Sequence, residues 1–469
     1  MTVAPHAGGA RPAFIRQAGQ PLAEQIANEL ARQIRDQGLR AGTRLPSIRE
    51  FARTAGVSRF TVVEAYDRLV AAGLAQSRRG AGFFVQAQPV VGIAAAAEAP
   101  PASIAPTRID VNWLLRSMFS DAAGAGMSGA AGLLPAEWLD ADMVAAAVRA
   151  VGRTVRAGLL AYGQPRGFAP LRQQVAARLQ ADGIAAHPER NLLTTAGVTH
   201  ALDLVVRHLV QPGDTVLVED PGWFVVFGRL AAFGARPIGV PRGPQGPDLA
   251  ALEVLAERHR PKLFIVNGAV HNPTGYSLSA GAAYEVLRLA ERFDFAVVED
   301  DTYGDMHPGG AVRLAALDGL RRVIHVGGYS KMLAASLRVG YLAAAPDVVQ
   351  RLADLKMLTG LTAPELGERV VHRVLADGQY RRHVERVRQR VDDARRRCLK
   401  GLQELGVDIT HEPVAGMFVW GDCGRDAEAL ARLAAERGLL LAPGSLFSPE
   451  QGFSRHLRFS VAMADNPPA

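Results

Sequence analysis

The chain has 469 residues, a length that favours about three domains over one. Apolar residues make up 48% of it and charged residues 21%, which excludes a largely disordered chain and allows large buried cores. The formal net charge is +7, and residues 1–88 carry most of it, with 12 arginines, no lysine and 6 acidic residues. A basic first part on a nearly neutral remainder predicts a polyanionic partner for the first part alone.

Several classes of protein are excluded by what the sequence lacks. Cys398 and Cys423 are its two cysteines; they form no disulfide framework, and the histidines show no ligand spacing, so we expect no metal site. No run of about 18 apolar residues could span a membrane. The first residues lack the charged and apolar blocks of a signal peptide, so we expect a cytoplasmic protein.

The N-terminal part begins with two predicted helices. Residues 1–13 are small and polar, and we expect them to be disordered. Apolar residues spaced four apart from Leu22 to Ile34 predict the first helix. Ser47 is followed three residues later by Glu50, a capping box that opens a short second helix.

A third helix and a ribbon complete this part. Ser58 opens the third helix, and Gly73 ends it. Residues 77–85 place a glycine turn between two short segments, which predicts a two-stranded ribbon. Three helices followed by a ribbon form a winged helix-turn-helix, which we assign to residues 14–86 and call the head.

Arginines around the second and third helices are the candidate DNA contacts. The third helix would lie in a major groove with its first residues toward the bases. Arg59 is the best candidate base reader, because its guanidinium matches the O6 and N7 acceptors of guanine. Arg44, Arg78 and Arg79 are expected to contact phosphate. The full predicted set is Arg44, Ser47, Arg49, Ser58, Arg59, Thr61, Arg78 and Arg79.

The head resembles the GntR family of winged-helix regulators over about 65 residues. The matching segments are 42–50 (GTRLPSIRE), 56–59 (GVSR), 61–69 (TVVEAYDRL) and 80–82 (GAG). The resemblance implies that the base-contacting arginines are Arg49 and Arg59 and that Thr61 also contacts DNA. Phe60 departs from the small polar residue often present at its position.

The rest of the chain divides into a linker and an α/β body. Residues 87–112 are rich in alanine and proline and predict a linker without one fixed conformation. From residue 113 to 469, short apolar runs alternate with helical stretches, which predicts a mostly parallel sheet with flanking helices. We expect a large part over 113–345 and a smaller α+β subdomain over 346–469.

Polar residues that follow successive apolar runs predict a pocket for pyridoxal phosphate (PLP), since ligands bind beyond the carboxyl ends of parallel strands. Lys331, one of four lysines, would supply the amine for the Schiff base. Asp300, rather than Asp301, would keep the pyridine nitrogen protonated. Asn272 and Tyr303 would donate hydrogen bonds to the phenolic oxygen.

The phosphate of the cofactor needs backbone N–H groups and positive charge. Residues 197–199 precede a helical run, and the N-terminus of a helix binds phosphate. Trp223 could stack on the ring. The predicted cofactor residues are Gly197, Val198, Thr199, Trp223, Asn272, Asp300, Tyr303, Ser330, Lys331 and Arg338, together with Tyr162, which is added by the resemblance described next.

The body resembles fold-type I aminotransferases of the class I/II group across residues 113–469. The resemblance rests on 162–167 (YGQPRG), 171–172 (LR), 194–197 (TTAG), 212–214 (PGD), 219–222 (EDPG) and 442–445 (APGS). It implies that Tyr162 reaches the phosphate across a dimer interface and that Arg458 binds the substrate carboxylate, with Arg455 a nearby competitor. Gly328 departs from the hydroxyl residue that often contacts the phosphate, and residues 335–336 (AS) depart from the usual Pro-Gly.

Head, linker and body together resemble the MocR subfamily of bacterial regulators. The resemblance implies a cytoplasmic, nucleoid-associated homodimer, commonly head to tail with swapped heads, that binds operator DNA. The signal would be an amino compound or the vitamer, sensed where PLP joins Lys331. The alternatives are an active aminotransferase with a secondary head, and a PLP reservoir or scaffold. The sequence leaves open the effector, the operator and the choice between activation and repression.

Overall fold

The computed structural model describes residues 21–36, 42–78, 81–86, 129–130 and 132–462. The expected disordered segment 1–13 and the expected linker 87–112 lie outside these ranges. The chain divides into two compact units, Met1–Ala102 and Ser103–Ala469, and each is described by itself. Among the helices described, none is long and apolar enough to cross a membrane.

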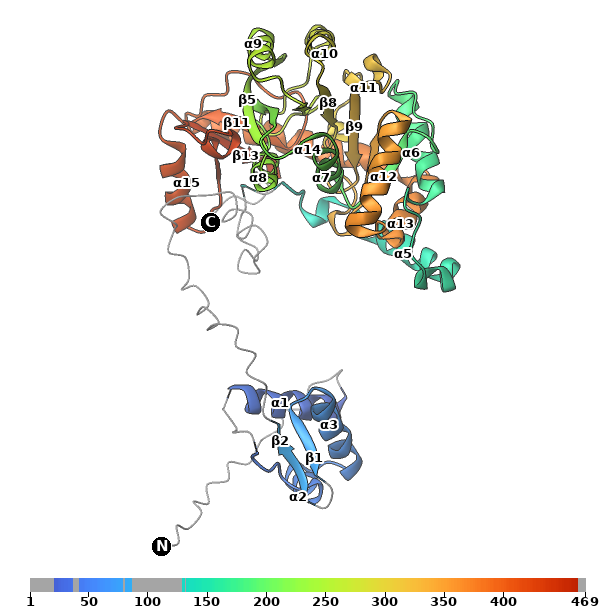
Figure 1. The fold of residues 1–469 in the computed structure, drawn as a ribbon. Helices are drawn as coiled ribbons and strands as arrows, with labels where there is room; N and C mark the ends of the chain where they lie inside the picture. The colour runs from blue at the N-terminus through green and yellow to red at the C-terminus, as the bar shows by residue number, and fades with distance from the viewer. Residues whose placement is uncertain (1–20, 37–41, 79–80, 87–128, 131, 463–469) are drawn as a thin grey trace. The chain divides into compact units, whose positions relative to one another are not determined.

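The first unit has the predicted order of three helices and a ribbon (Figure 1). Its elements are α1 (Leu22–Asp36), α2 (Ile48–Ala55), α3 (Arg59–Ala71), β1 (Ala75–Arg78) and β2 (Gly82–Val85). The helices share one core because Ile26, Val62 and Tyr66 are fully buried between them. The ring of Tyr66 packs edge-on against Phe83 of the ribbon, and its hydroxyl donates to the Pro46 carbonyl at 2.9 Å.

The second unit is built on an eight-stranded sheet in the order β3-β10-β9-β8-β7-β4-β5-β6. Strands β5, β4, β7, β8 and β9 run parallel to one another, whereas β10 is antiparallel to both β3 and β9, and β6 is antiparallel to β5. The fold expectation is therefore confirmed. The strands are β3 (Leu192–Thr195), β4 (Thr215–Asp220), β5 (Arg236–Gly243), β6 (Gly246–Pro247), β7 (Leu263–Val266), β8 (Ala296–Asp300), β9 (Val323–Gly328) and β10 (Gly340–Ala343).

Helices cover the sheet, and α7 and α12 lie side by side on it (Figure 1). The α-helices are α5 (Ala141–Val155), α6 (Ala169–Ala181), α7 (Val198–Leu209), α8 (Phe224–Phe233), α9 (Leu249–His259), α10 (Ala280–Phe293), α11 (Leu314–Asp318), α12 (Pro346–Gly360), α13 (Glu365–Ala376), α14 (Gln379–Glu404) and α15 (Ala427–Glu436). Short 3-10 helices are η2 (Ala136–Trp138), η3 (Arg156–Leu160), η4 (Gly304–Met306), η5 (Ala335–Leu337) and η6 (Gly444–Phe447).

A second, smaller sheet lies in the C-terminal part. It has the order β11-β13-β12, with β11 (Phe418–Asp422), β12 (Ala442–Pro443) and β13 (His456–Ser460). The sequence predicts strands at residues 416–420 and 456–460, which overlap β11 and β13, whereas β12 was not predicted. Helix α5 packs against α13, so the first helix of the body lies with helices that follow residue 345.

Candidate functional site

The carboxyl ends of β7, β8 and β9 bring the predicted polar residues together. Asp300 is the last residue of β8, Tyr303 lies three residues beyond it, and Lys331 lies three residues beyond β9. The Lys331 Nζ lies 5.8 Å from the centre of the Tyr303 ring. Because β8 and β9 are parallel neighbours, their two exits open on the same edge of the sheet.

The Lys331 amine is buried and held in place. Its Nζ donates a hydrogen bond to the Gly132 carbonyl at 2.6 Å. Burial and, to a smaller extent, the nearby Arg458 guanidinium lower the pKa of Lys331 to about 8. The Asp300 carboxyl group opposes this shift but does not cancel it. A depressed pKa leaves part of the amine without its proton at neutral pH, which is the state that a nucleophile requires.

A pH titration can test this environment directly. Burial lowers the pKa of Lys331 and of Lys356 to about 8, from an ordinary value of 10.5. In cofactor-free protein labelled with ¹⁵N-lysine, we therefore expect two Nζ signals to titrate near pH 8. The variants Lys331→Ala and Lys356→Met assign the two signals. The prediction fails if no lysine titrates below pH 9, roughly, since burial would then not disfavour the charged form.

Asp300 has the surroundings of a carboxylate that faces a ring nitrogen. Its Oδ1 accepts hydrogen bonds from the Thr302 N–H at 2.9 Å and the Thr302 hydroxyl at 2.5 Å. Burial raises the pKa of Asp300, against the opposing hydrogen bonds from Thr302. Asp301 forms an ion pair with Arg313 instead, because its Oδ2 lies 3.2 Å from the Arg313 Nε. The geometry supports the choice of Asp300.

The start of α7 forms a cradle for an anion. Gly197 caps this helix with φ at +85°, and a Cβ there would lie 2.6 Å from an Arg338 guanidinium nitrogen. Arg338 donates to the Ala196 carbonyl at 3.0 Å and to the Ser330 hydroxyl at 3.4 Å. Val198 and Thr199 supply the first backbone N–H groups of the helix. Helix start, guanidinium and hydroxyl thus converge as a phosphate site requires.

Arg458 is the guanidinium that a substrate carboxylate would meet. It is buried on β13, and it donates to the Asn272 side-chain oxygen at 2.9 Å and to the Ala130 carbonyl at 2.5 Å. Its Nε has no hydrogen-bond partner among the described residues. Burial lowers the pKa of Arg458 to about 10. By contrast, the predicted competitor Arg455 is exposed and ion-paired with Asp422.

These residues fit PLP and an amino substrate. The aldehyde needs an amine and the ring nitrogen needs a carboxyl group, and the pocket has a buried one of each. The phosphate would meet the helix start and its guanidinium, and the substrate would meet a buried arginine whose Nε has no partner among the described residues. Tyr303 is buried and in reach of Asn272, whose hydrogen bond opposes the rise in the Tyr303 pKa that burial causes.

Two predicted cofactor residues have different surroundings. Trp223 is half-buried at the N-cap of α8, where it packs against the apolar core. The side chain of Tyr162 is on the surface, with 81% of its area exposed. An exposed tyrosine at this place suits a residue that completes the site of another subunit, so its role stays a prediction.

Several residues of the site were missed by sequence reasoning. Gly132 and Ala130 accept hydrogen bonds from Lys331 and Arg458, which lie 199 and 328 residues further along the chain. The rings of Phe418 and Phe447 lie against the Arg458 guanidinium, at 4.2 and 5.0 Å. No local sequence pattern predicts these contacts, because each one depends on the packing of segments that are distant in the chain.

In the head, the serines predicted to contact DNA also cap helices. Ser47 accepts from the Glu50 N–H at 3.2 Å, and Ser58 accepts from the Thr61 N–H at 3.0 Å. Arg59 is exposed in the first turn of α3, and the neighbouring Phe60 has 77% of its area exposed. Caps that fix the first turn also fix the direction of these two side chains.

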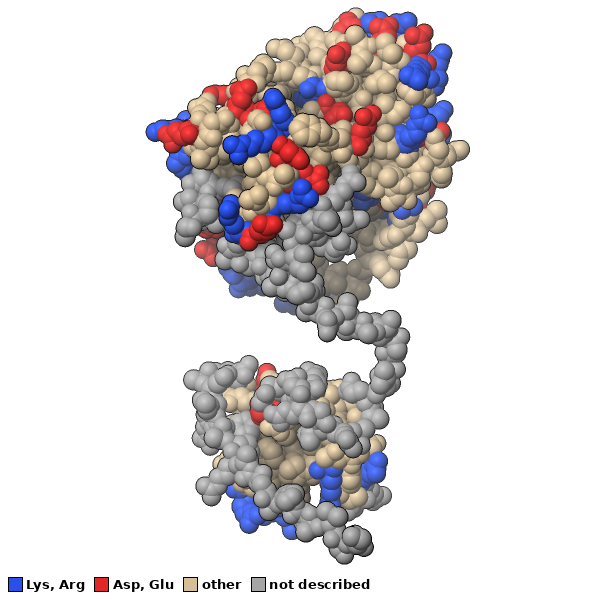
Figure 2. All heavy atoms as spheres, turned by 90° about the vertical axis from the view of Figure 1, so that its left-hand side faces the viewer, with Lys and Arg blue, Asp and Glu red and all other residues tan. Residues whose placement is uncertain are grey.

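The remaining predicted DNA contacts lie around the ribbon and α2. Arg49 is exposed on α2, and the Arg78 guanidinium lies 4.7 Å from the centre of the Phe84 ring. The backbone of Arg44 forms an antiparallel β-bridge with the backbone of Phe84. Arg79 lies outside the described residues. On the face drawn in Figure 2, basic side chains gather at the end of the head where α2 lies, whereas the body mixes both charges.

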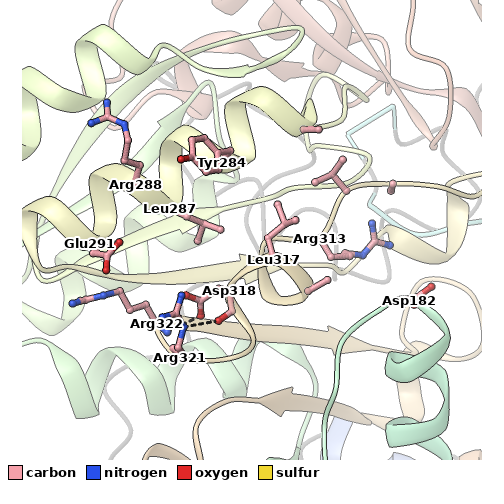
Figure 3. Close-up of a pocket in the computed structure, with 14 residues that line it drawn as sticks. Asp182, Tyr284, Leu287, Arg288, Glu291, Arg313, Leu317, Asp318, Arg321 and Arg322 are labelled. Carbon is pink, nitrogen blue, oxygen red and sulfur yellow. Dashed lines mark hydrogen bonds between the residues drawn. The ribbon is translucent and has the colours of Figure 1, made fainter.

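A cavity of about 890 Å³ lies away from the lysine (Figure 3). It opens between α10, α11 and the residues that enter β9, which is the amino end of that strand. Three of its four arginines have acidic partners: Arg288 pairs with Glu285, Arg313 with Asp301 and Arg322 with Asp294. Ligand sites of parallel sheets lie at the opposite, carboxyl ends. We therefore do not assign the predicted chemistry to this cavity.

Comparisons with known proteins match both parts of the chain. Residues 134–467 match the family "Aminotransferase class I and II", and residues 22–85 match "Bacterial regulatory proteins, gntR family". The chain is 34% identical to the 2-aminoadipate transaminase of Thermus thermophilus over 351 residues, 72% of this chain and 86% of that protein. It is 27% identical to the Escherichia coli "Uncharacterized HTH-type transcriptional regulator YdcR" over 94% of each chain.

Solved structures agree with the fold. The crystal structure of LysN, the α-aminoadipate aminotransferase of Thermus thermophilus complexed with N-(5'-phosphopyridoxyl)-L-leucine, superposes with a TM-score of 0.68. The match has 32% identity and covers 74% of this chain and 89% of that one. A kynurenine aminotransferase from Pyrococcus horikoshii matches with a TM-score of 0.69 at 26% identity, over 74% of this chain and 89% of that one.

Proposed function

The chain belongs to the aminotransferase class I and II family and carries a gntR-family head, and we propose that it is a PLP-dependent transcriptional regulator whose pocket senses an amino compound or the vitamer. This is the MocR-like architecture, and YdcR shares it over 94% of both chains. The observation that carries the proposal is a buried lysine of depressed pKa, in a pocket suited to PLP, on the same chain as a DNA-binding head.

Different residues of the pocket are expected to bind different parts of the cofactor and of the amino compound. PLP supplies an aldehyde that reacts with amines and a ring that accepts electrons. Lys331 offers the amine, and the Asp300 carboxyl group would lie beside the ring nitrogen. The cradle at Gly197 and Arg338 binds phosphate, and Arg458 binds the carboxylate of an amino acid. The signal is therefore expected to be an amine, with a carboxylate if Arg458 takes part.

Signalling requires that the ligand bind one arrangement of the protein better than the other. When an incoming amine takes the place of the Lys331 amine, the Lys331 side chain is released from its position and the pocket is repacked. A preference of about 3 kcal/mol for one arrangement would shift the ratio of the two roughly 150-fold. We propose a cytoplasmic homodimer in which the exposed Tyr162 reaches the site of the other subunit.

An active aminotransferase is the second candidate. It is favoured by the complete set of polar groups in the pocket and by the identity to the Thermus thermophilus transaminase. Purified full-length protein with PLP should be screened against amino acids for both keto-acid formation and binding to an operator selected from random DNA. A shift in operator binding with little turnover supports the regulator. Fast turnover with unchanged DNA affinity supports the enzyme, and neither response would leave a PLP reservoir.

Phe60 offers a test of base recognition by the head. An exposed aromatic side chain beside Arg59 can pack on the methyl group of thymine. Replacing a thymine of the selected operator by uracil removes only this methyl, and should weaken binding of the natural protein by about 1 kcal/mol at the contacted position. In the variant Phe60→Ala, the same replacement should have no effect. Val70→Ala, at the other end of α3, is the control and should keep the thymine preference.

A further inference from the structure

Lys356 is a second buried lysine, and it lies outside the cofactor pocket. Its side chain in α12 is fully buried, with 0% of its area exposed. The Nζ donates to the Pro165 carbonyl at 2.8 Å and to the Thr194 carbonyl at 2.9 Å. A buried ammonium group is costly unless it is paired and hydrogen-bonded. The two carbonyls belong to segments 29 residues apart in the chain, so this lysine ties them together.

Glu368 of α13 also forms hydrogen bonds with both of these segments. Its Oε1 accepts from the Thr194 hydroxyl at 2.5 Å, and its Oε2 accepts from the Phe168 N–H at 2.6 Å. Burial raises the pKa of Glu368, and Lys356 opposes that rise. Lys356 and Glu368 therefore both hold Thr194, Lys356 through its carbonyl oxygen and Glu368 through its hydroxyl group.

The tied segments approach each other closely. Gly167 has φ at +94°, and a Cβ there would lie 1.7 Å from the Thr194 hydroxyl oxygen. Only glycine fits at this distance, and the Thr194 N–H donates to the Arg166 carbonyl at 3.1 Å, so residues 166 and 167 lie directly against β3. The neighbouring Gln164 N–H donates to Glu365 Oε2 at 3.2 Å, which adds a further contact from α13.

Each tied segment leads to a part of the phosphate site. Strand β3 ends at Thr195, and Gly197 follows as the cap of the phosphate-binding start of α7. The other segment begins at Tyr162, the exposed residue expected to reach the phosphate of the other subunit. In a dimer with two such sites, a displacement between the two segments would therefore disturb the phosphate site of this subunit and that of the other subunit.

We propose that Lys356 and Glu368 are positioning residues that hold the start of α7 and the Tyr162 segment in the arrangement that binds the phosphate of the cofactor. Both residues act through Thr194 and residues 165–168, and not by direct contact with the phosphate. The proposal rests on the proposed function, because it requires PLP in the pocket. It predicts that the pair governs affinity for the phosphate rather than for the ring.

The test compares PLP with pyridoxal, which lacks the phosphate. In full-length protein, Lys356→Met keeps the length of the side chain and removes its donors. We expect it to weaken PLP binding about tenfold, as outer-shell changes commonly do, and to leave pyridoxal affinity within about twofold. Glu368→Gln should act in the same direction more weakly. Lys400→Met is the matched control, because Lys400 is exposed on α14.

The outcomes separate this inference from the proposed function. If the natural protein binds no PLP, the proposed function fails. If it binds PLP and Lys356→Met changes neither affinity, or lowers both equally, the positioning role is wrong. Should Lys356→Met fail to fold by circular dichroism, the double variant Lys356→Met/Glu368→Leu removes both charges together, and it should show the same selective loss for PLP.

Discussion

Lys331→Ala is expected to abolish the visible absorbance of bound PLP and leave a folded protein. The side chain supplies the only amine that the structure places beside Asp300 and Tyr303 among the described residues. Its removal costs one hydrogen bond to the Gly132 carbonyl, on the order of 1 kcal/mol of stability. Absorbance spectra and the melting temperature measure the two parts of this prediction, and mass spectrometry after borohydride reduction locates the cofactor on the chain.

The controls come from the remaining lysines. Lys262→Ala and Lys400→Ala change exposed side chains and should keep the spectrum of the natural protein. Borohydride reduction of the natural protein should place the pyridoxyl group on the peptide that contains Lys331. A label on another lysine, or an unchanged spectrum in Lys331→Ala, would contradict the assignment of the cofactor site.

The second large effect is expected from Arg59→Ala, which should remove most sequence-specific binding to DNA. A bidentate contact to guanine contributes about 1–3 kcal/mol, and two heads on a palindromic site would lose it twice. Non-specific binding should fall much less, because phosphate contacts supply it. Arg68→Ala is the matched control: it removes the same charge from the far end of α3, where Arg68 pairs with Glu24 and Glu64.

Titrations of operator and random DNA at several salt concentrations separate the two contributions. Arg59→Ala should lower the ratio of specific to non-specific affinity, whereas Arg68→Ala should keep this ratio. Equal losses in the two variants would mean that Arg59 acts only through its charge. Equal binding of the natural protein to all sequences would show that the head does not read bases.

Local patterns predicted much of the fold. The caps at Ser47 and Ser58 stand where the sequence placed them, because capping depends on residues three apart. The positions of Asp300 at the end of β8 and of Lys331 beyond β9 followed from apolar runs that end at polar residues. Parallel strands then brought these residues to one edge of the sheet, as the alternation of strands and helices implied.

Long-range contacts could not be predicted in the same way. The carbonyl of Gly132, the aromatic rings around Arg458 and the burial of Lys356 each depend on packing between distant segments. A lysine is ordinarily a solvated surface residue, and Lys356 carries no local sign of its two carbonyl partners. The small strand β12 was likewise missed, since two residues leave no periodic pattern.

The distribution of primary amines has a consequence for a protein that handles a reactive aldehyde. Residues 1–88 contain no lysine, and their positive side chains are all arginine, whose guanidinium group stays protonated at cellular pH. Free vitamer can condense with exposed lysines of the body such as Lys262 and Lys400, but the arginines expected to contact DNA offer it no comparable nucleophile. Adventitious modification by excess aldehyde therefore spares the charge of the DNA-binding surface, and lysine acetylation cannot neutralise it.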